Sequence, residues 1–310
     1  MDSLYVGMWS LIYDTIRAFW ALTEPRIKDA ARDNNMPIEL YYYGELGLEI
    51  FSLARFQKRD PYSNPAQFQQ AFENLAAEEW IVPQTESEFR VTERARDAAR
   101  TIVRVGDSYL GTLEVIAAGE AERTKSLLER IVAANHRAAE PPYKWATRTR
   151  FRVAEDASPQ LAQIREALMD LFAYRDDSHM SAWLDYPISG IAWDAFGMIW
   201  GSIAFTPEQI AAEAWFRGYA ATDYRRALDE LEMHGWIVTA PLAFNAAVPE
   251  PAAFDEYAQL TPIGKKLRDA VEELTDAYFY APWIGLDESE IQDLRLHLIE
   301  LRNQLSSASG

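Results

Sequence analysis

The residue types most suited to chemistry lie in the run Arg-Asp-Asp-Ser-His at positions 175–179. Carboxylates beside an imidazole can bind a metal ion or orient a general base, so Arg175, Asp177 and His179 form the first candidate site. Ion networks within a fold assemble the same residue types. In that structural interpretation, which we favour, Asp177 caps the next helix while Arg175 and His179 pair with acidic groups between domains.

Other catalytic patterns are missing from the chain. It contains no GxSxG, P-loop, GxGxxG or HExxH motif. Its four histidines are scattered without the i, i+4 spacing of metal ligands on a helix, and the absence of cysteine excludes thiolate sites and disulfides. We therefore expect neither an enzyme nor a cofactor or metal site.

A second set of side chains has the chemistry of nucleic-acid contact. A recognition helix needs hydrogen-bond donors near its N-terminal end, and a wing or neighbouring helix must hold phosphates. The residues that fit lie on one helix, after one wing and in the basic loop KWATRTRFR at 144–152, and they are Thr222, Tyr224, Arg225, Arg226, Lys265, Lys266, Arg148, Arg150 and Arg152. The alternative interpretation of that loop is that it balances acidic helices within the fold.

Acidic residues oppose this assignment at several points. Asp229, Glu230 and Glu232 share the helix with the arginines, and the segment EPAAFDEY at 250–257 would be an acidic wing tip. A corresponding helix at 65–79 contains no Lys or Arg, although its Gln and Asn side chains could read adenine edges.

Aromatic residues provide a third candidate site. A hydrophobic pocket for a small apolar ligand could be lined by Tyr42, Trp183, Trp200 and Trp215. The alternative is that most of these rings belong to the core, because aromatic residues on one helix face are usually buried.

Two parts of the chain show the same order of elements, which would position these side chains. In the first, Asn64 caps a helix that opens at Pro65, a hairpin follows at 80–92, and Thr92 starts another helix. In the second, residues 206–209 have the Thr-Pro-x-Gln pattern of a capping box, Gly218 makes a turn, Thr222 caps a helix through residue 234, and residues 261–262 start the last helix. Phe72, Leu75 and Trp80 correspond to Leu228, Leu231 and Trp236 at an offset of 156 positions.

This order of helix, turn, helix, wing and helix predicts a mainly α fold made of tandem winged-helix repeats joined by a helical linker. We expect residues 1–106 to form an N-terminal helix and the first winged helix, 107–184 the helical linker region, 185–305 the second winged helix, and 306–310 a disordered tail. We further expect apolar helices at 4–22 and 38–56, helices at 107–139 and 159–174, and two more within 175–203, separated near Pro187.

Composition limits the class of protein. With 310 residues, 49% hydrophobic and 25% charged, the chain can build a substantial core. The N-terminus lacks the basic region of a signal peptide, and Asp14 and Arg17 interrupt any membrane-spanning run, so we expect a cytoplasmic protein with no membrane partner. A net charge of −18 disfavours non-specific attraction to nucleic acid and leaves only a local basic face for DNA.

Four stretches carry a resemblance to a known family: RDDSHMSAWL (175–184), RRALDELEMHGWIV (225–238), LTPIGKKLRDAVEELTD (260–276) and APWIGL (281–286). From about residue 120 to 290 the chain resembles a little-characterised helix-turn-helix family found mainly in actinobacteria. Residues 175, 177 and 179 match its Arg-x-Asp-x-His element, and LTPIGKKLRDAVE is similar to the wing-to-helix junction of MarR-type regulators.

The resemblance implies a helix-turn-helix fold and carries no assigned activity. With the element order above, it favours a DNA-binding transcriptional regulator that responds to a small apolar ligand, and a homodimer is compatible with it. The alternative is a non-enzymatic ligand-binding or protein-interaction module in which the winged helices are structural.

Overall fold

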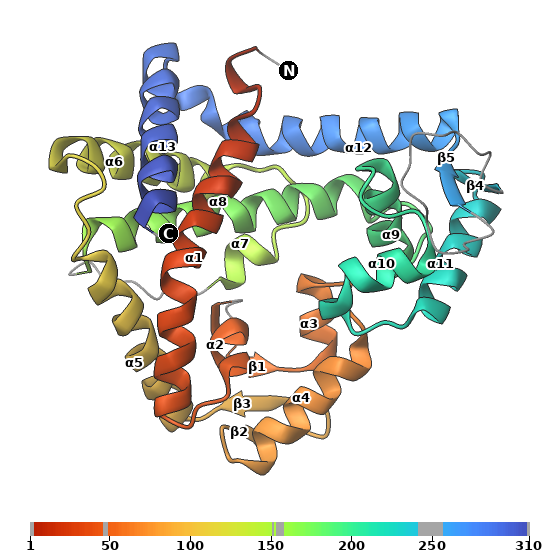
Figure 1. Ribbon diagram of the computed structural model, residues 1–310, viewed down its shortest axis with the longest axis horizontal. Coiled ribbons are helices and arrows are strands. Elements are labelled where there is room, and N and C mark those ends of the chain that lie inside the picture. The colour runs from red at the N-terminus through yellow and green to blue at the C-terminus, as the bar shows by residue number, and fades with distance from the viewer. Residues whose placement is uncertain (1–2, 46–48, 151, 153–157, 241–256, 309–310) are drawn as a thin grey trace. The chain divides into compact units, whose positions relative to one another are not determined.

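The computed structural model describes residues 3–45, 49–150, 152, 158–240 and 257–308 (Figure 1). The fold is mainly α-helical, with 71% of the residues in helices, and it carries two small antiparallel sheets. Its contacts group into two compact units, each assembled from separate stretches of the chain. Unit 1 contains residues 1–52, 72–181 and 274–310, and unit 2 contains residues 53–71 and 182–273.

Unit 1 is built mainly from long helices. Its elements are η1 (Ser3–Tyr5), α1 (Met8–Asp33), α2 (Ile38–Glu45), β1 (Ile50–Phe51), the end of α4 (Pro65–Ala77), β2 (Ile81–Pro83), β3 (Phe89–Val91), α5 (Glu93–Leu110), α6 (Ala118–Arg137), α7 (Ala146–Thr149), most of α8 (Gln160–Trp183), the end of α12 (Pro262–Tyr280), η3 (Ala281–Gly285) and α13 (Glu288–Ala308). The three strands form one sheet in the order β1-β3-β2.

Helix α1 is the centre of the unit 1 core, and it packs against α13 and α5 (Figure 1). It buries Ile12, Ile16 and Phe19 at intervals of three and four residues, the spacing that places side chains on one helical face. Helix α13 contributes Leu294 and Leu298 to the same cluster by the same rule. The prediction of a buried N-terminal helix is therefore confirmed.

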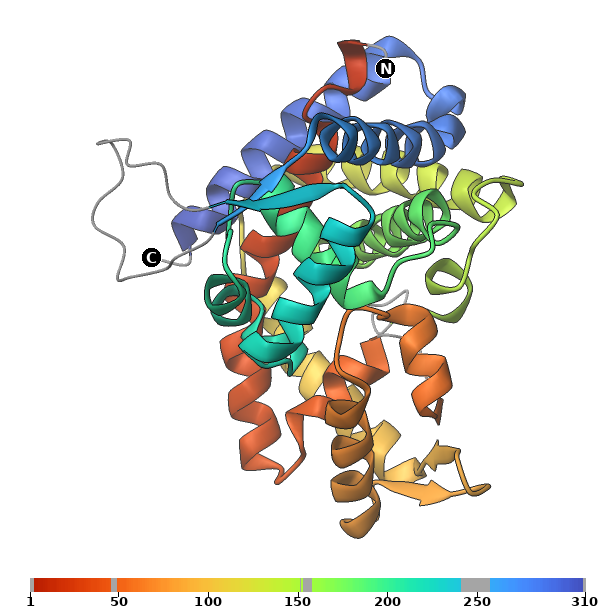
Figure 2. The ribbon, with the colours of Figure 1, turned by 90° about the vertical axis from the view of Figure 1, so that its right-hand side faces the viewer.

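Unit 2 contains a helix-turn-helix followed by a two-stranded wing. Its elements are α3 (Leu53–Arg59), the start of α4, the end of α8, α9 (Gly190–Trp200), α10 (Pro207–Glu213), η2 (Trp215–Arg217), α11 (Ala221–Met233), β4 (Ile237–Ala240), β5 (Tyr257–Leu260) and the start of α12. The two strands pair antiparallel, with Ile237 opposite Leu260 and Ala240 opposite Tyr257; β4 is the blue-green arrow and β5 the blue arrow in Figure 2. The expected acidic wing tip falls almost entirely within 241–256, outside the described residues.

Several expected helices have different limits. Residues 38–56 form α2, β1 and α3 rather than one helix, because Phe51 pairs with Phe89 of β3 and is fully buried. This tertiary pairing overrides the local helical pattern. The helix expected at 107–139 is interrupted between Leu110 and Ala118. Helix α8 runs without a break through residues 175–183, so the Arg-Asp-Asp-Ser-His run is inside a helix and does not start one.

Two expectations about termini and capping need correction. The tail expected to be disordered from residue 306 is helical as far as Ala308, because Leu305 is fully buried and holds the last turns of α13. Thr222 lies inside α11 and is not its cap; the Asp223 carboxylate accepts the Ala220 amide at 3.0 Å instead. The compact units also differ from the consecutive domain boundaries expected at 106 and 184, because helices distant in sequence pack on α1.

Candidate nucleic-acid interface

Helix α11 has one buried and one exposed face. Ala227, Leu228 and Leu231 lie on its buried face, while Thr222, Arg225 and Arg226 are exposed. The three exposed residues belong to the first two turns, where the second helix of a helix-turn-helix meets base edges. The helix N-terminus also carries a partial positive charge that favours phosphate.

Tyr224 does not belong to this exposed set. Its side chain is 0% exposed and its ring lies 6.0 Å from that of Tyr219, so it packs inside unit 2 and cannot contact DNA. Burial raises the pKa of its phenol. The sequence contains the reason for this burial, because Tyr224 precedes Ala227, Leu228 and Leu231 by three, four and seven positions.

Two exposed cations near this helix, Arg226 and Lys265, form weak ion pairs. Arg226 lies 3.3 Å from Asp223 within α11, and Lys265 lies 2.6 Å from Asp269 within α12; both are exposed pairs. Such pairs contribute about 0.3–0.5 kcal/mol. Phosphate can therefore replace the carboxylate partner at little cost. Arg225 and Lys266 are exposed beside them.

The start of α12 is anchored directly to the base of the wing. The Thr261 hydroxyl donates to the Gly235 carbonyl at 2.7 Å, and the Gly264 amide donates to the Thr261 oxygen at 3.0 Å. Gly264 lies so close to Trp236 that an added Cβ would be 2.0 Å from the Trp236 carbonyl oxygen. This contact explains the glycine in the Ile-Gly-Lys-Lys sequence, since it places Lys265 and Lys266 beside the wing.

Trp236 and Trp80 are both buried and make the same backbone hydrogen bond. Trp236 is 7% exposed and its amide donates to Leu231 at 3.1 Å, while Trp80 is 2% exposed and its amide donates to Leu75 at 2.9 Å. The residue before each Trp has a positive φ, +69° at Gly235 and +60° at Glu79. The prediction that both rings are buried at the base of a wing is confirmed.

A model of a helix-turn-helix family matches residues 154–310, slightly more than half of the chain. The chain belongs to this helix-turn-helix family. The match covers α8 to α13 and therefore includes α10, α11 and the wing. No curated protein and no solved structure matches the chain. Among the described residues, no helix is both long and apolar enough to cross a membrane.

The basic loop that precedes the family match is largely used inside unit 1. Arg150 is buried and lies 2.6 Å from both Glu166 and Asp170, and Arg152 also pairs with Asp170. Burial alone would raise the pKa of Glu166, but the charges of Arg150 and then Arg165 outweigh it and lower that pKa. Arg150 is therefore a structural residue with no route to a phosphate, while Arg148 is exposed.

The Arg-x-Asp-x-His element of the helix-turn-helix family has structural contacts in this chain. Asp177 accepts the backbone amides of Ala146 and Thr147 at 2.8 and 2.7 Å, so it caps the preceding helix α7 rather than the next helix. Arg175 pairs with Asp276, and the His179 ring nitrogen lies 3.3 Å from the Thr275 hydroxyl. Among the described residues, no group of three His, Asp or Glu side chains could hold a metal ion.

The aromatic residues expected to line a ligand pocket have unlike environments. Trp183 is 2% exposed and stacks on Trp193 with ring centroids 5.2 Å apart, so it belongs to the core. Trp215 is 76% exposed. The Trp200 indole donates to Asp269 at 2.8 Å, and the Tyr42 hydroxyl donates to Glu24 at 2.6 Å. Trp183 and Trp215 therefore do not share a pocket wall.

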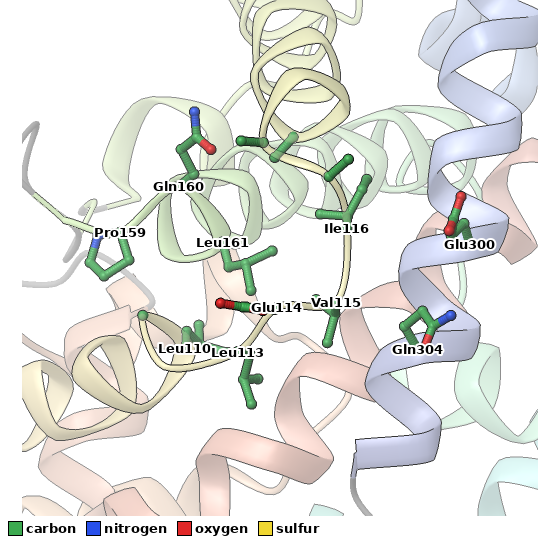
Figure 3. Close-up of a pocket in the computed structure, with 14 residues that line it drawn as sticks. Leu110, Leu113, Glu114, Val115, Ile116, Pro159, Gln160, Leu161, Glu300 and Gln304 are labelled. Atoms are coloured by element: carbon green, nitrogen blue, oxygen red, sulfur yellow. The ribbon is translucent and has the colours of Figure 1, made fainter.

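A cavity is present at a different place, within unit 1. It has a volume of about 670 Å³ and lies between the α5–α6 connection, the start of α8 and α13 (Figure 3). Leu110 and Leu161 form part of its apolar lining, and Glu300 and Gln304 face it from α13. The sequence does not predict this cavity because its lining residues come from segments far apart in the chain, with no shared motif.

Proposed function

We propose that the protein binds duplex DNA through α11, the β4–β5 wing and the start of α12. The observation that carries the proposal is the exposed end of α11, where Thr222, Arg225 and Arg226 lie on the face that a helix-turn-helix presents to the major groove. Lys265 and Lys266, beside the wing, would hold phosphates of the same site.

The acidic residues of α11 are compatible with this proposal because two of them have internal roles. Glu230 accepts the Ser189 amide and hydroxyl at 2.7 and 2.5 Å, and Glu232 accepts the Thr239 hydroxyl at 3.0 Å. Both belong to the second half of the helix, away from the end proposed to enter the groove. The net charge of −18 nevertheless requires that binding depend on these few cations and weaken with salt.

The test compares the wild type with Arg225→Ala/Arg226→Ala by binding to a genomic fragment library at low salt and then by salt titration of an enriched fragment. Each phosphate neutralised contributes about −0.9 to the slope of log affinity against log salt concentration. The double variant should therefore bind more weakly, and its slope should be smaller by the contribution of about two phosphate contacts. Arg32→Ala/Arg100→Ala is the matched control, since both are exposed and pair with an acid three residues earlier, as Arg226 does. An equal loss of DNA affinity in both double variants would contradict the proposal.

We also propose that α3, α4 and the β2–β3 hairpin are a first copy of the same winged-helix unit. The matching hydrogen bonds of Trp80 and Trp236, at an offset of 156 positions, support this proposal. Because the helix at 65–77 has no Lys or Arg, we assign DNA contact to the second copy alone.

The second candidate function is ligand binding, and the unit 1 cavity favours it. Its volume of about 670 Å³ suits a small molecule. More of the lining surface is polar than apolar, and Glu114 and Glu300 favour a ligand that carries a positive charge. As a regulator, the protein would release or retain DNA when this ligand binds.

Fluorescence anisotropy with the cationic dye rhodamine 6G tests the ligand site. Binding that weakens in Glu300→Gln and is absent for an anionic dye of similar size is the expected result. Equal binding of both dyes would contradict the charge preference.

A further inference from the structure

A segment of the first helix-turn-helix is built into unit 2. Residues 60–67, the turn and first residues of α4, contact the turn at 215–218 that precedes α11. The Asn64 amide donates to the Arg217 carbonyl at 2.8 Å, and the Asn64 side chain donates to the Gly218 carbonyl at 2.9 Å. The Gln67 side chain donates to the Phe216 carbonyl at 3.1 Å. Three successive carbonyls of the turn thus have partners from this one segment.

Arg217 is the centre of the contact. Its guanidinium lies 3.0 Å from Asp60 and 3.4 Å from Asp194, and it donates to the Ser63 hydroxyl at 3.3 Å. Its side chain is only 19% exposed, so these charge-assisted bonds lie largely out of water and are stronger than surface pairs. Arg217 is four residues before α11 begins, so these contacts fix the chain directly ahead of that helix.

Two close approaches complete the contact. An added Cβ on Gly218 would lie 2.2 Å from the Gln67 side-chain oxygen, and one on Gly190, at the start of α9, would lie 2.0 Å from the Pro61 carbonyl oxygen. The Trp183 indole donates to the Tyr62 hydroxyl at 3.0 Å. The segment is thus packed against three parts of unit 2. The Pro61 backbone leaves no room for a Cβ at Gly190, and a Cβ at Gly218 would have to displace the Gln67 side chain.

We infer that the DNA-binding unit is built from two separate parts of the chain. Asp60, Asn64 and Gln67 are positioning residues for α11. The N-terminal end of α4 does not itself read DNA. The inference rests on the proposed function of α11. The two amide side chains at this end of α4 are already used, because Asn64 and Gln67 donate to the turn at 215–218. The segment also lies outside the family match at 154–310, so that match does not include the whole of the proposed DNA-binding unit.

The absence of cysteine allows an unambiguous crosslink. The Gln67 Cβ lies 3.3 Å from the Cβ position of residue 218, slightly short of the 3.5–4.5 Å that a disulfide spans. In the full-length variant Gln67→Cys/Gly218→Cys, oxidation should form the bond quantitatively. The oxidised protein should bind the enriched DNA fragment at least as tightly as the same protein after reduction, because the bond replaces the contact that the Gln67 side chain made with the turn. Comparison with its own reduced form removes any effect of the substitution at the positive φ of Gly218.

A second variant tests positioning. Asp60→Ala removes one ion-pair partner of Arg217 but no exposed cation of α11. Added to the cysteine pair, it should weaken DNA binding by the reduced protein about tenfold. The slope of affinity against salt concentration should not change. Oxidation should restore the affinity. Three results would overturn the inference. The cysteine variant forms no disulfide, it loses DNA binding on oxidation and regains it on reduction, or Asp60→Ala leaves the DNA affinity unchanged. Failure of the wild type to bind DNA is the separate result that rejects the proposed function.

Discussion

Gly264→Ala should destabilise the junction between the wing and α12. The added Cβ would lie 2.0 Å from the Trp236 carbonyl oxygen, 2.7 Å from its carbonyl carbon and 2.9 Å from its Cα. All three atoms belong to the backbone, so no side-chain rotation relieves the clash, and either the start of α12 or the end of α11 must move.

The size of the effect follows from two opposing contributions. Overpacking of this kind costs about 1–3 kcal/mol, while replacing Gly by Ala within a helix gains about 1 kcal/mol at most. We expect the free energy of unfolding to fall by about 1–3 kcal/mol, because a clash with backbone lies at the upper end of the overpacking range. DNA affinity should fall as well, since Lys265 and Lys266 follow residue 264 directly.

Urea unfolding followed by circular dichroism measures the change, with Gly119→Ala as the matched control. Gly119 lies in the first turn of α6, and nothing lies within 4 Å of its Cβ position. The control should leave stability unchanged or raise it by up to about 1 kcal/mol. If Gly264→Ala is as stable as the control, the close packing between α12 and Trp236 is wrong.

Three further substitutions probe buried side chains. Trp80→Ala and Trp236→Ala should each lower the free energy of unfolding by roughly 3–5 kcal/mol, as for other buried aromatic truncations, and a loss below about 1 kcal/mol in urea unfolding would contradict their burial. Glu166→Gln should cost about 3–5 kcal/mol at neutral pH because it leaves Arg150 and Arg165 short of a buried partner. The lowered pKa of Glu166 means that the folded chain binds fewer protons than the unfolded chain, so its contribution is complete above about pH 4.3 and is lost as pH falls toward the folded pKa. Acid unfolding should thus be less steep in Glu166→Gln, and an identical acid profile would refute the assignment.

Local features of the fold could be predicted because the interactions that produce them span only a few residues. Thr206 and Gln209 form the expected capping box, and the Thr92 and Thr261 side chains accept amides at the start of α5 and α12. The hairpin after Trp80 and the strand after Trp236 also lie where the turn residues predict. The caps, and the bonds from the Trp80 and Trp236 amides that end the preceding helices, join residues three to five positions apart, which a sequence pattern records.

The sequence indicates the buried face of a helix, but it does not indicate burial that depends on tertiary contacts. The spacing of Tyr224 from Leu228 and Leu231 indicates the buried face, yet a chemical criterion alone selects Tyr224 as a DNA contact. For Arg150 the sequence shows only a basic loop. Its carboxylate partners lie 16 and 20 residues away, and only the packing of α8 makes it buried.

The sequence by itself determined a mainly α-helical chain with a helix-turn-helix and a wing after Trp236, because capping, turn and apolar spacing are local. The tertiary structure alone decided three other features. Residues 50–51 join a sheet rather than a helix, the cavity lies beside α13 rather than among the tryptophans, and residues 60–67 hold the turn before α11. Contacts such as that between Asn64 and Gly218 join residues 154 positions apart. Their partners are selected by which helices pack together, and no spacing in the chain encodes that choice.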